Sequence, residues 1–200
     1  MEFLVGSGLA AAAGLNAWMP LFLLGIANRF FDVIDLPAGW AWLSSDVALW
    51  ITGILLVVEF VADKIPAVDS VNDVIQTVVR PASGGIVFGA GAASEAVTDP
   101  STLLDDNAWV PIVVGIVLAL AVHALKATAR PVANLATAGL AAPGLSMAED
   151  VSAFALVVSA ILVPIVAGIL LIGLVAAAVL LIRWRRRAAR TRRAATSESA

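Results

Sequence analysis

Two groups of ionisable residues in this sequence have a spacing that could support chemistry inside a helical bundle. In the first group, Glu59 and Asp63 are four residues apart and Lys64 follows at once; the same helical face then continues, at spacings of four, four and three, through Asp69, Asp73, Thr77 and Arg80. Glu59 lies in an apolar run, where a carboxylate must be paired, protonated or hydrated. Two interpretations stand side by side: ion pairs with Lys64, Lys126 or Arg130 that fix the helix register, and a direct role in handling a substrate or a proton.

The second group is basic, and it comprises His123, Lys126, Arg130 and Asn134, at spacings of three, four and four. These side chains share one face if the helix continues past Lys126, with a kink expected at Pro131. His123 is the only histidine, so it is either a hydrogen-bonded packing residue or a proton relay, and it lacks the partners for a metal site. We expect the two groups to converge, as a charge-compensated site between helices or as a pocket for an anionic head-group lined by Lys126 and Arg130.

Motifs of the common enzyme classes are missing. The chain has no cysteine, which excludes disulfides, thiolate metal sites and cysteine nucleophiles. Ser83 precedes two glycines but has no nucleophile elbow around it, and neither a zinc-binding His-Glu-x-x-His nor a Walker loop occurs. We therefore assign no catalytic residue, no metal and no cofactor, and an enzyme is conceivable only through the carboxylates.

The composition indicates an all-α, polytopic membrane protein. Hydrophobic residues make up 61% of the chain and charged residues 14%, with a mean hydropathy of +0.99, whereas roughly a quarter of a soluble domain is charged. Residues 1–182 carry fourteen acidic and five basic side chains, and residues 183–200 carry seven arginines and one glutamate. This asymmetry predicts a membrane protein with a cytoplasmic C-terminus that could contact anionic lipids, and it disfavours nucleic acid as the partner.

The elements that would position these residues form a single transmembrane domain over residues 1–182, followed by a disordered tail over 183–200. We expect about five membrane-spanning helices, at residues 3–29, 47–62, 83–98, 109–125 and 151–182. Pro20 and Pro164 lie inside two of these runs and predict broken helices. The half-apolar segments 64–82 and 126–149 are expected to be interfacial or re-entrant. Gly85 and Gly89 form a small-xxx-small match that predicts close helix packing.

Several motifs together resemble a known bacterial membrane family, the domain of unknown function 4126. They are Gly14-Leu15-Asn16-Ala17-Trp18-Met19-Pro20-Leu21, Glu59-Phe60-Val61-Ala62-Asp63-Lys64-Ile65-Pro66-Ala67-Val68-Asp69, Arg80-Pro81-Ala82-Ser83-Gly84, His123-Ala124-Leu125-Lys126-Ala127 and Ser146-Met147-Ala148-Glu149-Asp150. The resemblance runs from about residue 5 to residue 180 and implies a small multi-pass inner-membrane protein. The family's polar motif positions fall here on Asn16, Glu59, Asp63, Lys64, Asp69, Arg80, His123, Lys126, Glu149 and Asp150, and the resemblance implies no role for them.

Three functions are compatible with these observations. The first is a transporter-like or channel-like protein whose site binds an ion, a small polar solute or a lipid head-group; its candidate site residues are Glu59, Asp63, Lys64, Asp69, Asp73, Arg80, His123, Lys126 and Arg130. Structural or gating roles are expected for Asn16, Pro20, Asn134, Glu149, Asp150 and Pro164. The small size predicts a homodimer, and similar residues in 53–72 and 115–134 hint at the internal repeats of many transporters. The alternatives are a non-transporting membrane scaffold or assembly factor and a lipid-modifying membrane enzyme.

Overall fold

The computed structural model describes residues 2–31, 33–94, 109–137 and 142–174, together with the single positions 176, 179, 180 and 183. Within these residues the fold is all-α, without a strand. The order of elements is α1 (Glu2–Leu15), α2 (Trp18–Phe30), the 3-10 helix η1 (Ala41–Ser44), α3 (Asp46–Ala62), α4 (Pro66–Ser94), α5 (Trp109–Thr137) and α6 (Ala142–Leu162), followed by a short apolar helix, Pro164–Leu174.

Local sequence explains where α3 and α4 begin. The Ser45 hydroxyl accepts a hydrogen bond from the Ala48 backbone N–H at 3.2 Å, and Asp46 adds a negative charge to the first turn of α3. Pro66 is the first residue of α4, where its fixed φ suits a helix and its missing N–H has no helical partner to lose. Because only residues 63–65 separate α3 from α4, the two helices bring Asp63 and the first turns of α4 together.

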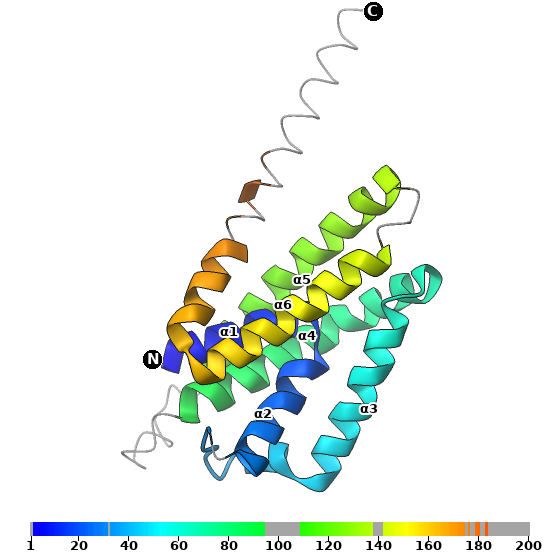
Figure 1. The fold of residues 1–200 in the computed structure, drawn as a ribbon. Helices are drawn as coiled ribbons and strands as arrows, with labels where there is room; N and C mark the ends of the chain where they lie inside the picture. The colour runs from blue at the N-terminus through cyan, green and yellow to red at the C-terminus, as the bar shows by residue number, and fades with distance from the viewer. Residues whose placement is uncertain are drawn as a thin grey trace, which may run out of the picture.

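Helix α1 is the centre of the bundle. It packs against α4, α5 and α6, and Figure 1 shows these three helices around it, with the α2–α3 pair to one side. The middle of α1 is a run of small side chains, and residues 9 to 13 are completely buried. Small side chains let neighbouring helices approach closely, which is why this short helix can be surrounded on several sides.

Glycines set the contact between α4 and α5. A Cβ at Gly84 would come within 2.7 Å of the Gly115 carbonyl oxygen, and one at Gly115 would reach the Phe88 Cβ at 2.5 Å. Gly85 and Gly89 face Ile112 of α5 in the same way. The expectation that these glycines serve helix packing is confirmed.

The distribution of polarity is reversed with respect to a soluble protein. Arg80 is fully buried and Glu59 is 2% exposed, whereas Trp50 on α3 is 73% exposed and Val78 on α4 is 74% exposed. Among the described residues, two helical segments are long and apolar enough to cross a membrane, Trp109–Arg130 and Pro143–Leu162, and two shorter apolar helices cover Phe3–Leu15 and Pro164–Leu174.

The helices extend further into the polar segments than the sequence predicted. Residues 66–82 form the first half of α4, while residues 126–137 form the end of α5 and residues 142–149 the start of α6. That these segments are interfacial or re-entrant stays a prediction. The apolar stretches at 83–94 and 109–125 are parts of longer helices, and α6 begins at residue 142, not at 151. Hydropathy underestimated these lengths because it stops at the first charges, while the helical spacing of those charges continues.

The two prolines behave differently from each other. The chain does break at Pro164, since α6 ends at Leu162 and a new helix begins with the proline. By contrast, Pro20 lies inside the first turn of α2, and the break between α1 and α2 precedes it, at residues 16 and 17. The prediction of a break at Pro20 was wrong in position, because a proline in the first turn removes no ladder hydrogen bond and can start a helix.

Candidate functional site

The break between α1 and α2 lies inside the bundle, and side chains from other helices satisfy its backbone groups. The Glu59 carboxylate accepts a hydrogen bond from the Ala17 N–H at 3.1 Å, and the Ser83 hydroxyl donates to the Ala17 carbonyl at 2.6 Å. The Lys126 ammonium donates to the Leu15 carbonyl at 3.2 Å. An interrupted helix leaves backbone groups without helical partners, and here buried polar side chains take their place.

Asn16 organises the break from within. Its side-chain oxygen accepts hydrogen bonds from the backbone N–H groups of Trp18 at 3.2 Å and Met19 at 3.0 Å, so the amide caps the start of α2. Its amide nitrogen donates to Asp150 of α6 at 3.2 Å. Asn16 is 1% exposed, and it ties the break to a helix more than a hundred residues away in sequence.

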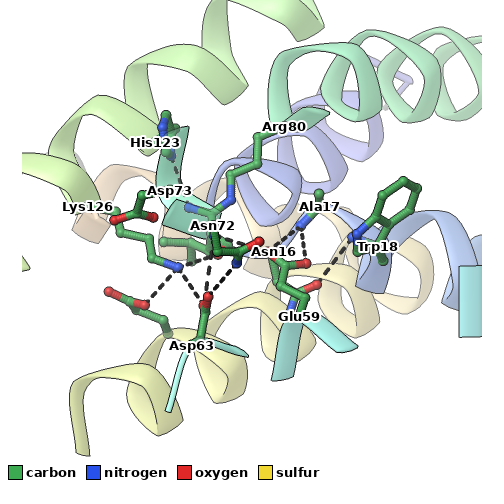
Figure 2. Close-up of polar contacts among 12 residues, drawn as sticks. Asn16, Ala17, Trp18, Glu59, Asp63, Asn72, Asp73, Arg80, His123 and Lys126 are labelled. Atoms are coloured by element: carbon green, nitrogen blue, oxygen red, sulfur yellow. Dashed lines mark hydrogen bonds and ion pairs between the residues drawn. The ribbon is translucent and has the colours of Figure 1, made fainter. Parts of the chain in front are cut away.

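Eight ionisable side chains converge on this break, and we call them the charged cluster: Glu59, Asp63, Lys64, Arg80, Lys126, Arg130, Glu149 and Asp150. Four are acidic and four are basic, so the cluster is neutral when all are ionised. Figure 2 shows its centre, where residues of α3, α4 and α5 point toward one another. The expected convergence of the two sequence groups is therefore found.

Arg80 and Glu59 form the most deeply buried pair of the charged cluster. The Arg80 Nη2 atom donates to Glu59 Oε1 at 3.0 Å, and the two side chains are 0% and 1% exposed. Glu59 thus accepts hydrogen bonds from two partners, the Arg80 guanidinium of α4 and the Ala17 N–H in the break. Ion pairs of Glu59 or Asp63 with Lys64, Lys126 or Arg130 were predicted. Asp63 does pair with Lys126 and Arg130, whereas Glu59 pairs with Arg80.

Asp63 is the acidic residue with the most cationic neighbours. It lies in the turn after α3, and its Oδ2 atom is 3.0 Å from Lys126 Nζ and 3.5 Å from Arg130 Nη2. Its Oδ1 atom accepts a hydrogen bond from the side-chain amide of Asn72 at 2.9 Å. Burial alone would raise the pKa of Asp63, but the charges of Lys126, Arg130 and Arg80 hold that pKa below its ordinary value.

Lys126 and Arg130 connect the cluster to α6 through Glu149. Glu149 Oε2 is 3.0 Å from Lys126 Nζ and 2.6 Å from Arg130 Nη2, and Arg130 Nε donates to Glu149 Oε1 at 3.2 Å. Arg130 therefore binds the Glu149 carboxylate through two parallel hydrogen bonds, the bidentate geometry that suits a guanidinium best. At the edge of the cluster, the half-buried Lys64 contacts Asp150 at 3.3 Å and lies over the Phe60 ring.

His123 adjoins the cluster without carrying an ion pair. Its Nδ1 atom is 3.0 Å from Arg80 Nη1, and its Nε2 atom is 3.1 Å from the Thr77 hydroxyl oxygen. The imidazole is 3% exposed, whereas Thr77 lies at the surface of α4. His123 thus lies between the buried guanidinium and the exterior of the bundle.

Most of the predicted site residues meet at the break, although the functions expected of them are untested by this geometry. Asp73 lies on α4 close to His123, and its Oδ1 atom is buried without a hydrogen-bond partner. Pro164 lies at the far end of α6, away from the cluster. The predictions for Asp69, Asn134 and the tail over 184–200 fall on side chains or residues outside the described part of the structure.

Sequence reasoning missed two contributors to the site and left a third without a role. Ser83 is considered from sequence only as a nucleophile, yet its hydroxyl donates to the Ala17 carbonyl, and Asn72, which contacts Asp63, was not chosen as a site residue. Thr77 was placed on the polar face but not among the site residues, and it contacts His123. The helical spacing of Thr77 and Ser83 from Arg80 was the available signal, since each is three residues away on α4. The backbone groups of residues 15 and 17 carried no sequence signal at all.

Two apolar grooves flank α2. One lies between α2 and α3, has a volume of about 580 Å³ and is lined by residues such as Phe22, Trp50 and Val57. The other lies between α2 and α6, with a volume of about 350 Å³. Neither groove is lined by a residue of the charged cluster.

Comparisons with known proteins bear on the family alone. No curated protein and no solved structure matches the chain significantly. One protein family, described as Domain of unknown function (DUF4126), matches residues 3–184. This match covers the broken α1–α2 segment, every residue of the charged cluster and His123. The chain therefore belongs to the DUF4126 family.

Proposed function

We propose that this protein is a multi-pass inner-membrane protein of the transporter-like or channel-like class, and that the charged cluster at the α1–α2 break is its polar site. The observation that carries the proposal is a helix interrupted inside the bundle, with ionised side chains on its freed backbone groups. Discontinuous helices of this kind form the substrate and ion sites of many secondary transporters.

The reversed polarity of the bundle supports a lipid environment. Apolar side chains cover the outer faces of α3, α4 and α6, while the ion pairs are inside. Ionisable residues at bilayer depth are costly and are retained where they face the protein interior and meet one another. The apolar grooves beside α2 have volumes that suit lipid acyl chains, and the arginines at 183–193 favour a cytoplasmic C-terminus.

The position of Glu59 suggests how a substrate would be recognised. Its carboxylate accepts hydrogen bonds from Arg80 and from the Ala17 N–H, which lies in the break just before α2. The N-terminus of a helix is a position where anions commonly bind. An ion, a small polar solute or a lipid head-group that competes for Arg80 or for Glu59 would therefore release the break. This competition couples ligand binding to a change in backbone position.

A non-transporting scaffold is the second candidate, and the closed pairing of the charged cluster favours it. Each of the eight members has an oppositely charged partner within 3.3 Å. Such a set could serve only to fix which helices pack together, since buried polar groups can specify a register.

Flux through proteoliposomes tests the proposed function. The full chain is reconstituted, and the entry of protons, Na⁺, K⁺, Cl⁻, phosphate, urea and glycerol is followed by fluorescent indicators and light scattering. We expect at least one of these probes to enter about tenfold faster than into protein-free vesicles, and Glu59→Gln to remove most of that excess. Asp46→Asn, in the exposed Arg29–Asp46 pair, is the matched control and should keep it.

Two outcomes would count against the proposal. If folded, reconstituted protein moves none of the probes, the transporter-like interpretation loses its support. If Glu59→Gln leaves every flux unchanged and instead dissociates the protein from a partner or lowers its thermal stability, the scaffold is favoured.

A further inference from the structure

The hydrogen bonds of His123 determine which of its nitrogens carries the proton. A guanidinium has donors only, so His123 Nδ1, 3.0 Å from Arg80 Nη1, must accept. A neutral imidazole then carries its hydrogen on Nε2, which donates to the Thr77 hydroxyl oxygen at 3.1 Å. The Thr77 hydroxyl in turn donates to the Asp73 carbonyl at 2.9 Å, so the three bonds are mutually consistent.

A second proton on His123 is incompatible with this arrangement. It would occupy Nδ1, where a donor would then face the donor of Arg80 and two positive charges would lie side by side in a buried site. The hydrogen bond would be lost, and Coulomb repulsion at this separation is strong where water is scarce. The guanidinium must therefore move away when the imidazole is charged.

Helix α4 carries buried side-chain atoms that make no hydrogen bond and could receive a displaced guanidinium. Three buried atoms on α4 lack a partner: Arg80 Nε, Gln76 Oε1 and Asp73 Oδ1. Gln76 is four residues before Arg80 and Asp73 is seven before it, so all three share one face of the helix. The Gln76 oxygen can accept from the displaced guanidinium, and the Asp73 carboxylate can pair with the imidazolium.

The charges around His123 are few. Arg80 and Asp73 face it from α4, and Lys126 lies one turn away on its own helix. Glu59 and Asp63 of α3 and Glu149 of α6 act on it only through Arg80 and Lys126. The part of α1 that packs against α5 has no ionisable side chain. Among the side chains that the structure describes, Asp73 is thus the acidic group positioned to favour an imidazolium directly.

We propose that His123 is the proton-binding residue of this site, and that proton binding moves Arg80 from His123 toward Gln76 while Asp73 pairs with the imidazolium. This proposal rests on the proposed function, since it names the proton as the ion that acts on the same site. Because Arg80 also holds Glu59, and Glu59 holds the Ala17 N–H, its displacement reaches the α1–α2 break. The proton comes from water, and no other bond is made or broken.

The single histidine makes the test unusually direct. The full chain, carrying a tag without histidine, is labelled with ¹⁵N-histidine in lipid nanodiscs, and ring ¹⁵N shifts are recorded from about pH 5 to about pH 9. We expect one neutral form at high pH, with the hydrogen on Nε2, and an imidazolium signal that grows as the pH falls. The opposite tautomer at high pH, or no imidazolium down to about pH 4.5, would overturn the proposal.

Two variants separate the proposed exchange from simple titration. Gln76→Leu removes an acceptor for the displaced guanidinium, so the imidazolium fraction at about pH 5 should fall about threefold or more while the neutral form is unchanged. Thr77→Val, at the surface, should weaken the preference for hydrogen on Nε2. Arg29→Gln, in the exposed ion pair, is the control and should alter neither signal. An unchanged imidazolium fraction in Gln76→Leu would contradict the exchange.

Failure here is distinguishable from failure of the proposed function. If His123 stays neutral while reconstituted protein still moves a solute, the proposed proton site is wrong, but the transporter-like function remains supported. If the imidazolium forms as expected and Gln76→Leu suppresses it, the proton site is supported even when no flux is found.

Discussion

At the scale of single residues, the decisive feature is a buried ion pair that also serves a backbone amide. Glu59 accepts hydrogen bonds from Arg80 and from Ala17 and is almost completely shielded from water. Removing one member of such a pair leaves the other charge buried without compensation, which is far more costly than losing an exposed pair. Replacing Glu59 should therefore lower the stability of the fold and also remove a hydrogen bond that holds the backbone of the break.

A comparison of two acidic residues measures this difference. Glu59→Ala should lower the free energy of unfolding by about 3–5 kcal/mol, because Arg80 is left unpaired in the interior. Asp46→Ala removes the carboxylate of the exposed pair with Arg29, where Asp46 is 78% exposed, and should cost about 1 kcal/mol or less. Unfolding in mixed micelles, followed by tryptophan fluorescence, gives both values; equal losses would show that burial of the pair is not decisive.

Sequence reasoning could predict these residues but not their pairing. The helical spacing placed His123, Lys126 and Arg130 on one face of α5. The single polar face predicted over residues 59–80 was wrong, because α3 ends at Ala62 and α4 begins at Pro66, so Glu59 and Arg80 lie on different helices. The spacing could not say that Glu59 pairs with Arg80, since that choice depends on how α3 and α4 cross. Contacts to backbone groups, such as that of Ser83 with the Ala17 carbonyl, cannot be predicted from residue type, because every residue carries the same backbone carbonyl.

At the scale of elements, the close approach of α4 and α5 aligns the charged faces of the two helices. Arg80 and His123 can meet at 3.0 Å because Gly84 and Gly115 let the backbones touch nearby. The sequence indicated this packing through its glycines, but it placed helix ends where hydropathy falls. The ends were wrong because buried charges lower the hydropathy of a segment without ending its helix.

Adding one methyl group between these helices should disturb the site without touching it. Gly115→Ala places a Cβ against Phe88 and the Gly84 carbonyl, which should cost about 1–3 kcal/mol through overpacking and weaken the contact between Arg80 and His123. Gly144→Ala is the control, since nothing lies within 4 Å of its Cβ and alanine favours a helix. Thermal unfolding and the ¹⁵N signal of His123 report the two effects; no change in either for Gly115→Ala would contradict the packing argument.

At the scale of the whole molecule, the bundle places ion pairs within and apolar side chains outside. Composition alone indicated this reversal, and the tail arginines indicated an orientation. The α1–α2 break was expected from Pro20 and is instead fixed by Asn16, which lies in the break, and by Glu59, Ser83 and Lys126 of three different helices. The capping asparagine is a local signal for the start of α2, but the contacts from the other three helices depend on tertiary packing.

The central claim is that water and solutes reach the charged cluster at the break during function. A chain without native cysteine allows a direct test, in which single cysteines at Ser83 and Val87 of α4 meet a membrane-impermeant methanethiosulfonate reagent in intact vesicles. The account predicts slow but complete modification of Ser83→Cys beside the break and none of Val87→Cys in the apolar core. If Ser83→Cys stays as unreactive as Val87→Cys, the cluster is sealed from water and the proposed site does not exist.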